Sequence, residues 1–227
     1  MNIKLYKGLV AGLCTFLAIG FQPAQAVLVS AGDFNDNDCA GYFGIPFGAC
    51  TIFVPDNGGV IELSPVIAKY DMNEAGDTIV KTEVNTALYP TVDGTEFSFT
   101  PGPSGTWTYT QGTDDPGVRY WVAKAANDFT LFWDVDAADI ESPCSSTATD
   151  QTNYNLACLQ AANLVTTGYW ETAGGKGLSH LTFYDTEPVS TSNGGGEEEV
   201  PEPGVLALLG IGLLGGLVAR RRFTKQG

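Results

Sequence analysis

The stretch Phe129-Thr130-Leu131-Phe132-Trp133-Asp134-Val135 decides the fold class of this chain. Apolar side chains occupy its odd-numbered positions, and Thr, Phe and Asp occupy the even-numbered ones. A period of two places successive side chains on opposite faces of an extended backbone. The stretch therefore predicts a β-strand with one face packed against a core.

Shorter segments rich in Thr and aromatic residues repeat this pattern on both sides, which suits a pleated, half-buried surface. They are residues 96–100, 106–110, 119–123, 168–171 and 181–184. Clusters of Gly, Pro, Asp and Ser separate them and are typical of turns. Many short strands with such turns predict a mainly β domain over residues 27–188, a β-sandwich or jelly roll. Residues 155–163 are expected to add one or two helical turns.

The N-terminal end has the pattern of a secretory signal peptide. Lys4 and Lys7 precede an apolar run over residues 8–21, and Ala24-Gln25-Ala26 supplies small residues at the −3 and −1 positions of a cleavage site. A buried N-terminal helix would not require all three features. We expect residues 1–26 to be a signal peptide and the mature chain to begin at Val27.

The part between the two ends is strongly acidic. All 26 acidic residues follow Ala26, and only five bases lie between Val27 and Pro203, which gives this part a formal charge of −21. Such a surface repels nucleic acid and favours cations or basic partners. We therefore expect no nucleic-acid partner, and we interpret the acidity first as a source of solubility. The five bases are Lys69, Lys81, Arg119, Lys124 and Lys176.

Four cysteines remain once Cys14 is assigned to the signal peptide. An even number of cysteines in an exported chain indicates two disulfides, and four cysteines allow three connectivities. The local pairing of Cys39 with Cys50 and of Cys144 with Cys158 is the simplest, because each bond closes a short loop. A metal site is the alternative, but the chain has no C-x-x-C pair and a single histidine.

The composition changes abruptly after Pro188. Residues 189–199 are rich in Ser, Gly and Glu and are predicted to form a flexible linker. Residues 200–204 then introduce a Pro-Glu-Pro break, followed by an apolar run over residues 205–219 and by Arg220-Arg221-Arg222. The run is shorter than the roughly 20 residues of an ordinary span, and we expect it to be a short transmembrane helix. The arginines are expected to stop it on the cytoplasmic side.

This three-part tail resembles the PEP-CTERM sorting signal of Gram-negative bacteria, which membrane proteases called exosortases recognise. The resemblance rests on Pro201, Glu202 and Pro203, on the Gly- and Leu-rich run, and on Arg220-Arg221-Arg222. It implies that an exosortase is a partner, that the precursor is anchored in the inner membrane, and that the product is displayed at the cell surface or released. It also implies an association with exopolysaccharide and biofilm. An ordinary single-span anchor is the alternative interpretation.

No residue of the domain is predicted to be catalytic, and no cofactor is expected. His180 lies in an alternating segment and is interpreted as a structural histidine, because no G-x-S-x-G motif accompanies it. A carboxylate pair for glycoside hydrolysis remains open, but the abundance of Asp and Glu prevents the choice of any pair.

Two acidic clusters raise the question of calcium. The first begins like an EF-hand loop, but its sixth position is Asp and its twelfth is Gly44. We therefore favour solvated turn residues at both clusters and expect no metal. The first cluster is Asp33, Asn35, Asn37 and Asp38, and the second is Asp134, Asp136, Asp139 and Glu141.

The aromatic residues of the domain allow two interpretations. Proteins that bind sugars often stack exposed rings on them, but large rings more often fill a core. The rings considered for a sugar-binding surface are Trp107, Tyr109, Trp121 and Trp170. The sequence thus predicts a cell-surface or extracellular-matrix protein, with a carbohydrate-binding module as the alternative and a secreted hydrolase third.

Overall fold

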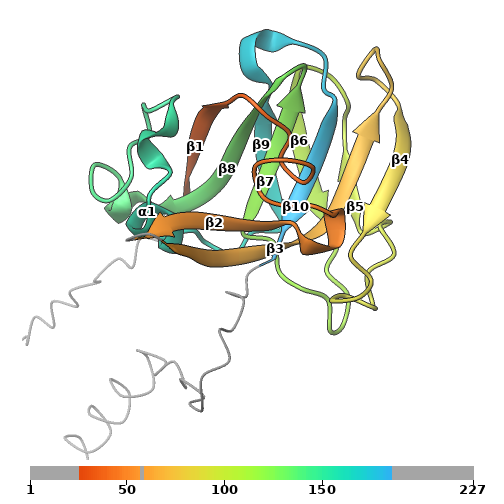
Figure 1. Cartoon of the computed structure of the whole chain (residues 1–227), viewed down its shortest axis with the longest axis horizontal. Helices are drawn as coiled ribbons and strands as arrows, with labels where there is room; N and C mark the ends of the chain where they lie inside the picture. The colour runs from red at the N-terminus through yellow and green to blue at the C-terminus, as the bar shows by residue number, and fades with distance from the viewer. Residues whose placement is uncertain (1–25, 57–58, 186–227) are drawn as a thin grey trace, which may run out of the picture. The chain divides into compact units, whose positions relative to one another are not determined.

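The computed structural model describes residues 26–56 and 59–185, and within them the chain is mainly β (Figure 1). The signal peptide, the linker, the Pro-Glu-Pro segment and the apolar run predicted from the sequence lie outside these residues, apart from Ala26. The strands are β1 (Ala26–Phe34), β2 (Thr51–Asp56), β3 (Gly59–Met72), β4 (Ile79–Val84), β5 (Phe97–Phe99), β6 (Ser104–Tyr109), β7 (Tyr120–Ala125), β8 (Asp128–Asp136), β9 (Thr167–Glu171) and β10 (His180–Tyr184). The one α-helix of the described part is α1 (Leu156–Gln160).

The strands form two antiparallel sheets. The larger sheet has the order β1-β8-β7-β10-β3-β2, with β4 also paired to β3, and the smaller sheet has the order β5-β6-β9. Strand β3 is long enough to serve two regions, because its first half pairs with β2 and its second half pairs with β10 and β4. The larger sheet is thereby curled into a half-barrel (Figure 1).

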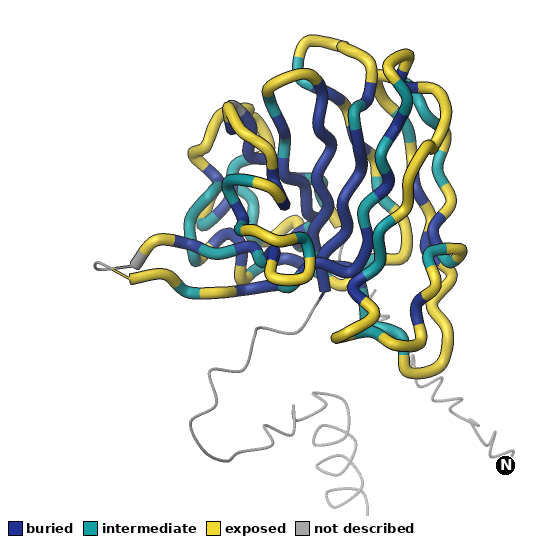
Figure 2. Tube along the Cα trace, turned by 45° about the vertical axis from the view of Figure 1, so that its right-hand side comes forward, coloured by how far each residue is buried: buried dark blue, intermediate teal, exposed yellow. Residues whose placement is uncertain are grey.

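Two hydrophobic clusters form the core. The first lies on the inner face of the curled sheet and includes Phe34, Phe43 and Trp133. The second lies between the two sheets, where Trp107 of β6 meets Trp121 of β7 with ring centroids 5.1 Å apart. Figure 2 shows the result as a continuous series of buried strands with exposed turns at their ends. Buried aromatic pairs of this kind stabilise the packing of one sheet on the other.

Every strand predicted from the sequence is present, with ends within two residues of the expected ones. The predicted 129–135 strand is β8; its odd-numbered face is buried, and its even-numbered face is half-buried except at Phe132. Phe129, Leu131 and Trp133 belong to the first cluster, whereas Phe132, 3% exposed, belongs to the second. The expected helical turn is α1, whose N-terminus is capped by the side chain of Asn155.

Candidate functional site

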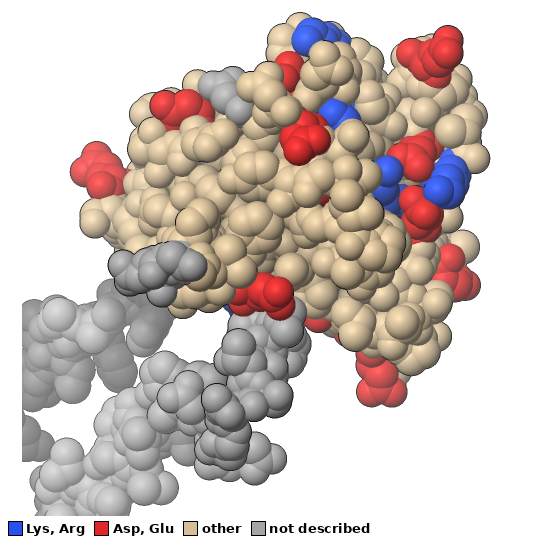
Figure 3. Space-filling view, in the orientation of Figure 1, with Lys and Arg blue, Asp and Glu red and all other residues tan. Residues whose placement is uncertain are grey.

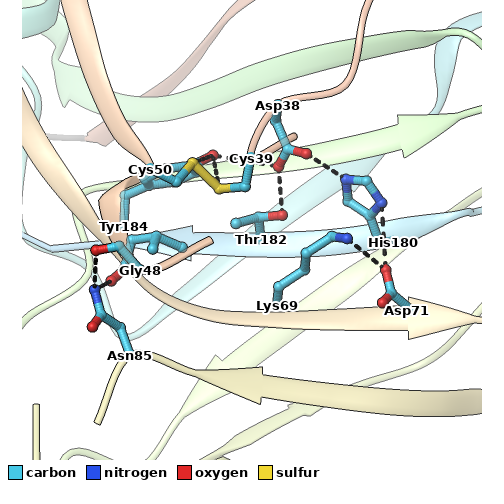
Figure 4. The surroundings of a disulfide bond; sticks show 11 residues. Asp38, Cys39, Gly48, Cys50, Lys69, Asp71, Asn85, His180, Thr182 and Tyr184 are labelled. Atoms are coloured by element: carbon cyan, nitrogen blue, oxygen red, sulfur yellow. Dashed lines mark hydrogen bonds and ion pairs between the residues drawn. A yellow bond between two sulfur atoms is a disulfide. The ribbon is translucent and has the colours of Figure 1, made fainter. Parts of the chain in front are cut away.

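A buried contact between a carboxylate and an imidazole joins the loop after β1 to the last strand of the domain (Figure 4). Nε2 of His180, the first residue of β10, lies 2.7 Å from Oδ1 of Asp38. The hydroxyl of Thr182 donates to Oδ2 of the same carboxylate at 2.6 Å, and the hydroxyl of Tyr184 lies 3.3 Å from it. These three side chains share a face because they occupy alternate positions of a strand. Asp38 is thereby bound by one entire face of β10.

The neighbouring strands extend this polar arrangement. In the register of the sheet, His180 lies opposite Asp71 of β3 and Lys124 of β7. Nδ1 of His180 is 3.7 Å from Oδ1 of Asp71, and Nζ of Lys69 is 2.8 Å from the same oxygen. Nζ of Lys124 donates to the carbonyl oxygens of Asp36 and Ala126. We call Asp38, Lys69, Asp71, Lys124, His180, Thr182 and Tyr184 the polar cluster.

Burial and charge shift the pKa values within the polar cluster. Burial by itself raises the pKa of Asp38, but the charge of His180 and hydrogen bonds from His180, Thr182 and the Cys39 backbone hold that pKa well below its usual range. Burial, followed by the nearby Asp38 carboxylate, raises the pKa of Tyr184. Burial lowers the pKa of Lys124, and the nearby carboxylates oppose this effect. The cluster therefore favours an ionised Asp38 and a protonated Tyr184.

The disulfide Cys39–Cys50 adjoins the polar cluster. Its two sulfur atoms lie 3.4 and 3.6 Å from the hydroxyl of Tyr184. Asn85 donates to the carbonyls of Gly48 and Val66 and so ties the same loop to β3 (Figure 4). The disulfide thus closes the loop between β1 and β2 on itself, while the contacts of Asp38 and Asn85 hold that loop to the sheet.

These contacts enclose the side chain of His180, which the sequence interprets as a structural histidine. The side chain of His180 is 6% exposed, and it is enclosed by Asp38 and Asp71. The two hollows on the described surface with volumes of about 260 and 280 Å³ are lined by neither His180 nor Asp38. The arrangement can therefore stabilise the fold, because a buried charge needs such partners to offset its desolvation.

The predicted pairing of the cysteines is confirmed. The bonds are Cys39–Cys50, with 11 residues of separation, and Cys144–Cys158, with 14. The second bond fastens the segment that follows β8 to helix α1. The other two connectivities left open by the sequence are not formed.

The interpretation of the first acidic cluster as solvated turn residues is wrong for Asp38. Asn35 and Asn37 are exposed, but Asp38 is buried because three side chains of β10 bind it. In the second cluster, Asp134 is half-buried, which raises its pKa, and Asp136 accepts a hydrogen bond from Asn163. Across residues 26–56 and 59–185, no group of three or more His, Cys, Asp or Glu side chains is arranged to hold a metal ion.

The four rings considered for a sugar-binding surface are part of the core. Trp107, Trp121 and Trp170 are fully buried, and Tyr109 is 4% exposed. They face the second cluster because large apolar rings are stabilised by leaving water. The hypothesis that these particular rings stack on a sugar is therefore wrong, and the alternative that they fill the core is confirmed.

Comparison with known protein families identifies the tail. A PEP-CTERM protein-sorting motif matches residues 199–222, which include Pro201, Glu202 and Pro203 and end at Arg222. This motif is the mark of an exosortase substrate. The motif marks a protein that is exported and sorted to the cell surface. No curated protein and no solved structure is significantly similar to the chain.

The PEP-CTERM motif lies outside the described residues, and so do the expected signal peptide and the expected membrane segment 205–219. Within the described part, no helix is long and apolar enough to cross a membrane. The sequence pattern found this sorting site because its residues are contiguous. It did not find the pairing of Asp38 with His180, because 142 residues separate them and no periodic signal connects them.

Proposed function

We propose that this PEP-CTERM protein is a non-catalytic component of the extracellular matrix, associated with exopolysaccharide after exosortase processing. The observation that carries the proposal is the sorting motif at residues 199–222 behind a disulfide-bonded β domain. Disulfides persist in oxidising compartments outside the cytoplasm, so both features fit the same location. The proposed precursor is held in the inner membrane of a Gram-negative bacterium by its apolar segment.

The C-terminal end of the folded domain is compatible with processing of the tail by an exosortase. Asp185 follows β10 and is fixed, because its N–H donates to the carbonyl of Pro65 and its carboxylate accepts from Tyr89. Thirteen residues, 186–198, separate it from the motif. When fully extended, a segment of that length spans about 45 Å. An exosortase can therefore reach the motif without loss of the β10 contacts.

The surface charge supports a matrix role in which Lys and Arg side chains do not drive binding. On the face shown in Figure 3, acidic side chains are dispersed and lysines lie beside acidic residues. Lys69 pairs with Asp71, Lys81 pairs with Glu83, and Lys176 lies 3.7 Å from a carboxylate oxygen of Asp128. Such a surface keeps a displayed protein soluble at high local concentration.

A secreted hydrolase is the less supported role. Its only imidazole would be His180, and that side chain is bound on both ring nitrogens by carboxylates of the polar cluster. A hydrolase would need a reacting carboxylate pair or a nucleophile within reach of substrate.

The proposal is tested by fractionation of cells into membrane, cell-surface and matrix material. In wild-type cells the protein is expected in the matrix, and replacement of Pro201, Glu202 and Pro203 by Ala is expected to retain it in the membrane. Equal amounts in the matrix for both chains would contradict the sorting part. Release of reducing sugar ends from matrix polysaccharide by the purified protein would contradict the non-catalytic part.

A further inference from the structure

The smaller sheet exposes a regular array of hydroxyl groups on the face opposite its tryptophans. In the register of β5, β6 and β9, Ser98 lies opposite Thr108, and Thr108 lies opposite Thr167. The next rows pair Thr106 with Tyr169 and Ser104 with Glu171. All of these residues are exposed. The hydroxyl face is defined as Ser98, Ser104, Thr106, Thr108, Thr167, Tyr169 and Glu171.

The alternate residues of the same strands hold this face in place. Trp107 and Trp170 are fully buried against the larger sheet, and Phe97 stacks on Phe183 with ring centroids 4.2 Å apart. Gly168 approaches so closely that an added Cβ would lie 2.7 Å from atoms of both Trp107 and Trp121. The hydroxyl groups therefore stand on a rigid layer, at about 4.8 Å between strands and about 6.8 Å along each strand.

One ring stands on the hydroxyl face. The side chain of Tyr169 is 42% exposed, and its hydroxyl lies 3.4 Å from Oε2 of Glu171. The hydroxyl of Thr167 donates to the carbonyl of Trp107, so its oxygen can still accept hydrogen bonds. The face thus combines an aromatic surface with donors and acceptors, and its single charged side chain is Glu171.

A hollow adjoins the hydroxyl face where β9 ends. Its volume is about 260 Å³, and Glu171 lines it together with Ser30, Thr130 and Thr149. Phe132 forms an apolar part of its wall. The hollow continues the chemistry of the face, with further hydroxyl groups beside a ring.

We propose that the hydroxyl face binds a neutral polysaccharide, with Tyr169 against the face of a sugar ring and with Ser, Thr and Glu171 at its hydroxyl groups. This inference rests on the proposed matrix function and names the site within the domain. Sites for polyols need a few placed polar groups beside an aromatic surface, and both are present. The charge of −21 on the exported part and the absence of Lys and Arg from this face disfavour an acidic polymer.

A second copy of the chain fits this surface less well. Stable contacts between identical chains are rich in apolar side chains at their centre. The hydroxyl face offers one partly exposed ring among five Ser and Thr side chains. A sugar chain can use each of those hydroxyl groups, whereas a dimer would have to desolvate them.

The test is affinity electrophoresis of the full-length chain, purified in a sugar-free non-ionic detergent, through gels that contain one polymer. The neutral polymers are hydroxyethyl cellulose, dextran and galactomannan, and the anionic ones are alginate and polygalacturonate. At least one neutral polymer is expected to retard the protein, and neither anionic polymer is. This readout does not depend on exosortase processing, so its failure is distinct from failure of the matrix assignment.

Variants locate the binding site. Tyr169→Ala is expected to weaken binding about tenfold, and Tyr169→Phe to weaken it less because the ring remains. Thr106→Val with Thr108→Val removes two hydroxyl groups at nearly constant volume and is also expected to weaken binding. Val80→Thr, at an exposed position of β4, is the control and should bind like the wild type.

Three outcomes would overturn the inference. These are no retardation by any neutral polymer, retardation by the anionic polymers alone, or unchanged binding of both Tyr169→Ala and the Thr pair variant. Sedimentation analysis adds a fourth outcome: a dimer that Tyr169→Ala abolishes would assign the face to contact between copies and contradict sugar binding. Equal melting temperatures of the variants and wild type show that the fold is intact.

Discussion

Nε2 of His180 lies 2.7 Å from Oδ1 of Asp38, and this contact joins the first long loop of the domain to its last strand. Both side chains are buried, so the contact is shielded from salt and water. Because β10 pairs with β7 on one side and β3 on the other, the loop is fixed to the centre of the larger sheet. The only histidine of the chain therefore connects this loop to the larger sheet.

Replacement of Asp38 by Asn is expected to lower the free energy of unfolding by about 3 kcal/mol, the range for one broken partner of a buried pair. The amide removes a charge opposite His180 and places N–H groups where Thr182 and Tyr184 need an acceptor. Denaturant unfolding measures the loss. Glu74→Gln, at an exposed position, is the control, and equal stability of the two variants would contradict the role of Asp38.

The Asp38 contribution should also disappear in acid. The pKa of Asp38 is lowered in the folded domain, so its contribution is present above the unfolded value of about 3.9 and is lost as the pH falls through the lower folded value. The stability difference between wild type and Asp38→Asn is expected to shrink as the pH falls below about 4. Unfolding at a series of pH values from 2 to 7 measures it. A difference that grows in acid would contradict the assignment.

Alkali is expected to destabilise the domain through its buried tyrosines. Burial raises the pKa of Tyr120 to about 12, whereas an unfolded tyrosine ionises near pH 10. Because the pKa of Tyr120 is higher in the folded domain, the contribution of Tyr120 to stability is present below about pH 10 and is lost as the pH rises above it. Unfolding from pH 8 to 11.5 tests this, and Tyr120→Phe should reduce the slope. A free energy of unfolding that stays constant over this range would be the contrary result.

Gly168→Ala is expected to destabilise the domain by about 2 kcal/mol, since overpacking a tight core costs about 1 to 3 kcal/mol. The new methyl group would meet Trp107 and Trp121 at 2.7 Å. Gly48→Ala is the matched control, because its nearest neighbour, a side-chain oxygen of Asn85, lies 3.9 Å from the added carbon. Thermal unfolding of both variants decides the matter, and similar losses would show that the contact with the tryptophans is not tight.

The two disulfides are expected to differ in their contributions. Chain entropy alone assigns about 3 kcal/mol to each, because the loops have similar lengths. Removal of Cys39–Cys50 should lower the free energy of unfolding by at least about 1 kcal/mol more than removal of the other bond. It also releases Cys39, the neighbour of Asp38, and each buried hydrogen bond of Asp38 contributes about that amount. Unfolding of the two double Ala variants measures the difference. Equal losses would mean that the bond and the polar cluster act independently.

The second half of the domain could be predicted well from the sequence because its strands alternate densely. Strands β5 to β10 carry Thr and aromatic residues in a period of two, and the Gly- and Pro-rich turns separate them. Strands β1 to β4 were not predicted. Strand β3 contains Pro65 and changes partners midway, and β4 exposes Ile79 and Val80, so neither shows a clean apolar face.

The sorting motif and the polar cluster differ in how visible they are in the sequence. Pro201, Glu202 and Pro203 lie next to each other beside an apolar run, so local order identifies them. Asp38 and His180 meet only because β10 is inserted between β7 and β3. The outward direction of Tyr169 likewise follows from the pairing of β9 with β6, which turns Trp170 inward. Such positions depend on the register of strands that are far apart in the chain.

The central claim is that this chain is an exported exosortase substrate, and intact mass spectrometry of the protein from cells with and without the exosortase tests it most directly. We predict a mature chain that begins at Val27 in both strains and has lost the apolar segment 205–219 only where the exosortase is present. A chain that ends at Gly227 in both strains would contradict the account.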